Sequence, residues 1–166
     1  MTLPRLSWEE RPAEIANLLN PAFCAVLLRD AAIGYQSQSS QTLPYPLAFL
    51  ILPIVLYRPT REALPESTIT ILHAWIQEHP ALQSAVIERV RRLEPYIREA
   101  LLFALQHDIL RVTEDGGLES ALSRVRNLFP EQSEPNMCRK KAALVGRWFG
   151  KTADASMILA MWGLRP

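Results

Sequence analysis

The segment from residue 101 to residue 119 constrains the fold of this 166-residue chain more than any other. It begins with apolar residues at helical spacing, continues as a short β-prone run at 109–113, and then reaches Asp115, Gly116 and Gly117. This turn sequence supplies the positive φ angles that a tight hairpin requires. A helix that leads directly into a small hairpin is typical of the end of a winged-helix module. Such modules bind nucleic acids or other proteins far more often than they catalyse reactions.

The whole pattern predicts a mainly α (α+β) protein: a helical domain with a winged-helix-like module and a small β-hairpin wing. Hydrophobic residues make up 49% of the chain and charged residues 21%, as in an ordinary folded domain. We expect one compact domain over 1–166, with a subdivision into 1–128 and a C-terminal helical segment, 137–166, as the alternative. The formal net charge of +1 argues against a dedicated nucleic-acid binder and leaves room for a local basic patch.

Proline, glycine and capping residues predict where the helices begin and end. Asn20 and Pro21 have the character of the N-cap and first residue of a helix that Gly34 ends. Pro80 and Pro95 each predict the start of a separate helix. The other expected helical segments are 12–19, 60–63, 67–79, 137–149 and 153–161, with polar connections at 36–42 and 130–136.

Residues 46–57 form the longest apolar stretch, with a proline at its start and Pro53 inside it. A strand would lose a hydrogen bond to its neighbour at Pro53, which favours a buried, kinked helix; a central strand is the alternative. The stretch is far shorter than the ~20 residues needed to cross a bilayer, so we expect no membrane association.

The two cysteines, Cys24 and Cys138, predict no disulfide. Cys24 lies in an apolar helical run, where a free thiol behaves as a small hydrophobic side chain. Residues 1–11 carry charges and a proline where a secretory signal would be apolar. We therefore expect a cytoplasmic protein with reduced cysteines.

No sequence motif predicts catalysis, a cofactor or a metal. Gly150, Lys151 and Thr152 resemble the end of a phosphate-binding loop, but Val145 stands where that loop needs its first glycine. The three histidines lie on different predicted elements without metal-ligand spacing. We expect a protein that is not an enzyme.

Basic residues gather between 89 and 98, where glutamates interleave with arginines. Such a pattern is typical of a solvated helix surface with ion pairs along it. A phosphate or acidic-partner contact is the alternative. The residues that could make a nucleic-acid contact are Arg89, Arg91, Arg92, Arg111, Lys140 and Lys141.

Trp8 and Trp162 lie near the two ends of the chain. Frayed termini seldom carry large aromatic side chains, so we expect both ends to be fixed, either on this domain or on a partner.

Several motifs resemble, in order, those of the middle component of ABC-three-component (ABC-3C) systems. The residues that carry the resemblance are Trp8-x-x-Arg11-Pro12, Asn20-Pro21-Ala22-Phe23, Leu50-x-Leu52-Pro53, Thr60-Arg61-x-x-Leu64-Pro65, Gly146-Arg147-Trp148-Phe149 and Gly163-Leu164-Arg165-Pro166. Together they span nearly the whole chain, and 36–42 and 121–136 match only weakly.

The resemblance implies a subunit that works beside an ABC-type ATPase and a third component, in bacterial conflict and phage defence. It offers no catalytic motif. We therefore expect a non-enzymatic adaptor that couples the ATPase to the third component, with a winged-helix DNA-binding regulator as the alternative. Its oligomeric state is not predicted. The partner-binding candidates are Trp8, Arg11, Arg61, Arg147, Trp162, Arg165 and Pro166.

Overall fold

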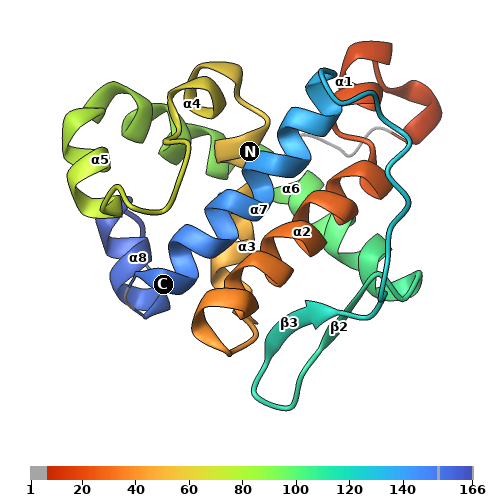
Figure 1. The fold of residues 1–166 in the computed structure, drawn as a ribbon. Coiled ribbons are helices and arrows are strands. Elements are labelled where there is room, and N and C mark those ends of the chain that lie inside the picture. Colours follow the sequence, from red (N-terminus) through yellow and green to blue (C-terminus); the bar gives the residue numbers. More distant parts are fainter. Residues whose placement is uncertain (1–6, 153, 166) are drawn as a thin grey trace.

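A computed structural model describes residues 7–152 and 154–165, so Pro166 lies outside the described residues (Figure 1). Helices dominate it, as expected for a mainly α protein with a small sheet. The α-helices are α1 (Ala13–Leu18), α2 (Pro21–Ser39), α3 (Ala48–Val55), α4 (Arg58–Ala63), α5 (Leu72–Glu78), α6 (Pro80–Gln106), α7 (Glu134–Lys151) and α8 (Ala155–Met161). Two 3-10 turns, η1 (Trp8–Glu10) and η2 (Tyr45–Leu47), precede α1 and α3.

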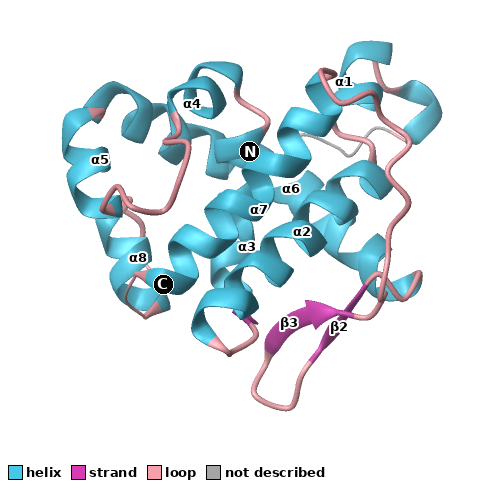
Figure 2. Ribbon diagram, in the orientation of Figure 1, coloured by secondary structure: helices cyan, strands magenta, loops and turns pink. Residues whose placement is uncertain are grey.

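The predicted hairpin is confirmed and belongs to a three-stranded antiparallel sheet (Figure 2). The strands β1 (Leu43–Pro44), β2 (Leu110–Val112) and β3 (Gly117–Ser120) lie in the order β1-β3-β2. Gly116 takes the positive φ of 82° that the turn requires, and the Gly117 N–H donates to Asp115 Oδ1 at 3.2 Å. Hydrogen bonds from Thr113 and Gly117 hold the pKa of the Asp115 carboxyl below its usual value. The winged-helix assignment itself stays a prediction.

Two parallel helices, α2 and α7, form the centre of the molecule and lie side by side in Figure 1. Asn20 caps α2 as predicted, but Gly34 does not end it; the helix continues to Ser39 and stops at left-handed Ser40. Gly34 is required for another reason: a Cβ there would overlap the Ala143 carbonyl oxygen of α7.

The same close approach explains two glycines of α7. A Cβ on Gly146 would overlap the Ala31 carbonyl oxygen, and one on Gly150 would lie 2.6 Å from the Tyr35 carbonyl oxygen. Gly150 therefore packs against α2, and α7 continues one residue further, to Lys151. The glycines that punctuate the sequence here allow two backbones to touch.

The apolar stretch at 46–57 is helical, which settles the alternative between helix and strand. Every residue of α3 is buried except half-buried Phe49, and Pro53 lies inside the helix. Pro53 costs one backbone hydrogen bond, and the burial of a helix that is apolar on all sides compensates for it.

The prediction of two helices separated at Pro95 was wrong, because α6 is one continuous helix of 27 residues with Pro95 inside it. Its buried face runs unbroken past the proline, through Val86, Leu93, Ile97 and Leu101. Contacts along this stripe outweigh the local preference of proline for a helix start.

Two other helix boundaries also differ from the expectation. The helix expected at 67–79 begins only at Leu72, and α7 begins at Glu134 instead of Met137, with Ser133 as its N-cap. The polar stretch 36–42 supplies the last turn of α2 before it becomes a loop.

One hydrophobic core joins residues from Leu19 to Trp162, and both cysteines are buried free thiols within it. By length and composition alone, residues 16–39 are apolar enough to cross a membrane, and half of that window is buried inside the protein. The core helix of a soluble protein meets the same criterion.

Candidate functional site

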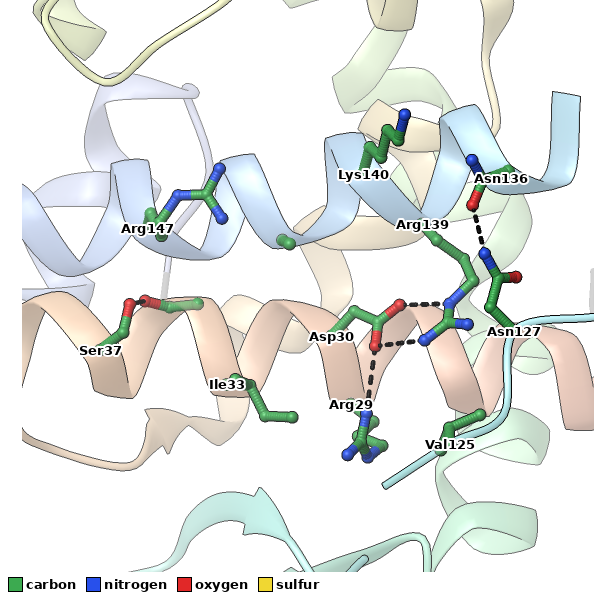
Figure 3. Close-up of a pocket in the computed structure, with 12 residues that line it drawn as sticks. Arg29, Asp30, Ile33, Ser37, Val125, Asn127, Asn136, Arg139, Lys140 and Arg147 are labelled. Carbon is green, nitrogen blue, oxygen red and sulfur yellow. Dashed lines mark hydrogen bonds and ion pairs between the residues drawn. The ribbon is translucent and has the colours of Figure 1, made fainter. Parts of the chain in front are cut away.

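A solvent-open groove of about 600 Å³ runs between α2 and α7 (Figure 3). The chain between the sheet and α7 closes one side of it, through Val125 and Asn127. Asn127 donates an amide hydrogen bond to Asn136 Oδ1 at 2.8 Å, which fixes this segment to α7. The groove combines apolar and charged side chains, a composition suited to recognition.

A buried charge cluster occupies the centre of the groove. Asp30 of α2 accepts two hydrogen bonds from Arg139 of α7, at 2.7 Å from Nε and 3.1 Å from Nη2. Arg29 also donates to Asp30, at 3.3 Å, and to the Leu122 carbonyl oxygen at 3.1 Å. Figure 3 shows Arg139 reaching across from α7 to this carboxylate. The cluster therefore ties together α2, α7 and the connecting segment.

Two further cations of α7 line the groove closer to solvent. Lys140 is exposed and lies 3.6 Å from the carboxylate of Glu131, itself an exposed side chain. Arg147 has no hydrogen-bond or ion-pair partner among the described residues, and no dashed line reaches it in Figure 3. Arg29, Arg139, Lys140 and Arg147 thus face a single lining carboxylate, Asp30. The groove carries a local positive charge that the nearly neutral chain does not.

A second exposed feature lies on another flank of α7, in the loop between α4 and α5. Ile69 is 83% exposed and Ile71 is 71% exposed, more than most of the chain's large apolar side chains. Three side chains of α7 fix the loop by donating to its carbonyl oxygens: Lys141 to Pro65 (3.5 Å), Trp148 to Thr70 (2.7 Å) and Lys151 to Thr68 (3.3 Å). These bonds hold the loop on α7 and leave the two isoleucines facing solvent. They also explain why α5 begins at Leu72 and not at residue 67, where the sequence predicted its start.

The predicted partner residues fall into different environments. Arg61 is buried, donates to the Val55 carbonyl oxygen at 2.8 Å and pairs with Glu134. Arg11 pairs with Glu99 at 2.9 Å and lies over the ring of Tyr96. Both arginines therefore join elements within this fold.

Trp162 is fully buried, and its ring centroid lies 6.2 Å from that of Trp75. The C-terminal segment therefore packs against the core. The Gln83 side chain donates to the Met161 carbonyl oxygen at 2.8 Å and anchors the same segment on α6. Arg165 is exposed beyond this anchor. The side chain of Trp8 and all of Pro166 lie outside the described residues.

The predicted nucleic-acid contacts lie on three elements, α6, β2 and α7. Most of them are occupied: Arg89 lies over Tyr57, Arg92 pairs with Glu88, Arg111 pairs with Glu119, and buried Lys141 lies 3.6 Å from Glu66. Burial lowers the pKa of the Arg89 guanidinium. Exposed Arg91 lies on α6, and only Lys140 belongs to the groove. The ion pairs agree with the interpretation of 88–98 as a solvated helix surface.

The described residues contain no group of three or more His, Cys, Asp or Glu side chains that could hold a metal ion. Burial raises the pKa of the Cys24 thiol to about 12 and also raises that of Cys138. Both thiols are therefore protonated at neutral pH.

Sequence reasoning missed most of the groove. Arg29, Asp30 and Arg139 were not among the candidates, although an adjacent Arg-Asp pair in the middle of an apolar helix was a usable signal. Ile69 and Ile71 gave no signal, because the sequence predicts that both lie within one helix over 67–79. Arg147 and Lys140 were named, on separate grounds, and the structure brings them to one site.

The family comparison covers nearly the whole described chain. Residues 8–166 match the family model for the ABC-three component (ABC-3C) system Middle Component 3. No curated protein and no solved structure shows significant similarity to the chain. Because the match extends over far more than half of its length, the chain belongs to the Middle Component 3 family of ABC-3C systems.

Proposed function

We propose that this middle component is a non-enzymatic adaptor that binds two other components of its ABC-3C system and couples the ATPase to the third component. Family membership makes it one part of a multi-component system. The adaptor role, the cytoplasmic location and a role in phage defence are parts of the proposal. No chemical step is assigned to the subunit.

One observation carries the proposal: two surfaces of different chemistry lie on different flanks of α7. The groove carries positive charge next to α2. The loop between α4 and α5, here called the 65–71 loop, exposes Ile69 and Ile71 while α7 side chains bond to its carbonyl oxygens. An adaptor needs two separate binding surfaces on a rigid body. Helix α7, bonded to both features, provides that connection.

The alternative, a DNA-binding regulator, receives less support from the charges. Glu114 and Asp115 are exposed at the tip of the hairpin, where a DNA-binding wing would meet phosphates. Arg111 on β2 is already paired with Glu119. A fluorescence anisotropy titration with duplex DNA tests this alternative, which requires binding that weakens steeply as salt rises.

Co-purification of the three components tests the adaptor role. With only the ATPase tagged, we expect the third component to co-purify when the middle component is co-expressed and to be lost when it is omitted. Recovery of the third component without the middle component would contradict the proposal.

A further inference from the structure

We infer that the α2–α7 groove binds an acidic segment of a partner protein, with carboxylates that pair with Arg147 and Lys140. This inference rests on the proposed adaptor function and deepens it. It concerns what one of the two surfaces recognises.

The ligand chemistry follows from what the groove's cations already bind. Arg139 and Arg29 share the Asp30 carboxylate, and Lys140 lies beside the Glu131 carboxylate. Arg147 is the lining cation with no such partner among residues 7–152 and 154–165. A carboxylate from outside would complete the pattern, because guanidinium groups bind carboxylates through parallel hydrogen bonds.

The Lys140 pair allows exchange. Its two side chains are exposed and 3.6 Å apart, a separation at which a surface ion pair is weak. An incoming carboxylate can replace Glu131 at low cost. The buried Asp30–Arg139 pair, by contrast, stays in place as the fixed floor of the groove.

The spacing of the two cations limits the shape of the partner segment. Lys140 and Arg147 are seven residues apart on α7, which corresponds to roughly 10 Å along the helix axis. Two acidic residues seven apart on a partner helix, or three apart on an extended segment, match this distance. Ile33 and Val125, which also line the groove, give the segment apolar contacts in addition to the charges.

A protein segment fits better than a nucleic acid. Protein surfaces that bind nucleic acids are strongly positive and polar over a large area, whereas this groove encloses about 600 Å³ and includes apolar side chains. The overall charge of +1 and the carboxylates at the hairpin tip also disfavour a polyanion.

Zero-length crosslinking in the reconstituted three-component complex tests the inference. A carbodiimide joins a carboxylate only to an amine that touches it, so Arg147→Lys places a reporting amine beside natural Lys140. We expect mass spectrometry to find both amines linked to Asp or Glu residues of one short segment of a partner component. Arg91→Lys, at an exposed position of α6, is the matched control and should give no such link.

Affinity measurements complete the test. Arg147→Glu should weaken binding of that component roughly tenfold or more, and reversal of the linked partner carboxylate to Lys should restore it. Arg91→Glu should leave the affinity unchanged. Arg147→Met, compared with the wild type by circular dichroism, verifies that the fold survives loss of the charge.

The possible failures are distinguishable. If no complex forms with the wild-type protein, both the adaptor function and the acidic segment are wrong. If the complex forms but links from Lys140 reach only Glu131, or charge reversal changes nothing, the adaptor function stands and the groove assignment falls. Links or affinity that vanish after nuclease treatment would assign the groove to nucleic acid instead.

Discussion

At the scale of single residues, Arg61 holds two helix ends together. Its guanidinium donates to the Val55 carbonyl oxygen at the C-terminus of α3 and pairs with Glu134 in the first turn of α7. Positive charge stabilises a helix C-terminus and negative charge a helix N-terminus, so both contacts follow the helix dipoles. The resemblance to middle components had made Arg61 a partner candidate, and its position in the structure supports a stabilising role.

We predict that Arg61→Met lowers the free energy of unfolding by about 1–3 kcal/mol, because the buried Val55 carbonyl oxygen loses its guanidinium donor and keeps only the weak Cys138 S–H, at 3.9 Å. Urea denaturation followed by circular dichroism measures the change. Arg58 lies on α4, as Arg61 does, but its side chain is exposed. Arg58→Met is therefore the control and should change stability little. Unchanged stability in Arg61→Met together with loss of a partner would show that Arg61 serves an interface.

The buried Cys24 thiol should make the protein less stable at alkaline pH. Burial raises its pKa from the ordinary 9.0 to about 12, so the folded state keeps the proton over a range where the unfolded state releases it. This contribution to stability is complete below pH 9 and is lost as pH rises toward 12. We expect the unfolding free energy of the wild type to fall more steeply between pH 8 and pH 10.5 than that of Cys24→Ala. Equal slopes would contradict the burial argument.

Among the elements, signals that act within one helical turn predicted boundaries correctly, and residues whose contacts are distant misled the prediction. Asn20 and Pro21 start α2 because a capping side chain and a proline act within one turn. Gly34 and Pro95 misled the prediction because their contacts are distant: Gly34 touches α7, and Pro95 lies within a continuous buried stripe. The groove was hidden for the same reason, since Asp30 and Arg139 are 109 residues apart.

Gly146→Ala tests the close packing of α2 and α7. In an ordinary helix interior this change adds stability, because alanine favours the helix. Here the new Cβ overlaps the Ala31 carbonyl oxygen, so we expect a loss of about 1–3 kcal/mol as the helices separate. Thermal unfolding of the variant and the wild type shows directly whether the substitution raises or lowers stability. A gain in stability would show that the helices tolerate separation.

Pro95→Ala tests the continuity of α6. Proline contributes no backbone N–H and its ring crowds the preceding turn, whereas alanine restores the hydrogen bond. We expect a gain of about 1–3 kcal/mol in the unfolding free energy, reduced by the greater freedom of the unfolded chain. A loss of stability would indicate that the helix needs the proline at this position.

At the scale of the whole molecule, the fold places two different surfaces on one rigid helix. Helix α7 contacts α2 through glycines and bears three of the four cations of the groove, Arg139, Lys140 and Arg147. It also holds the 65–71 loop by three side-chain hydrogen bonds. The hydrophobic core encloses Trp162 and fixes the C-terminal segment on the same body. This arrangement suits a subunit that keeps two partners at a fixed relative position.

A bridging subunit binds one component through the groove and another through the 65–71 loop, so the affinity for each component is measured separately. We expect Arg147→Glu to weaken binding of one component only, and the double variant Ile69→Ser, Ile71→Ser to weaken binding of the other only. Arg91→Glu should affect neither affinity. If both surface variants weaken the same component, or if neither variant changes any affinity, the subunit does not bridge its partners through these two surfaces.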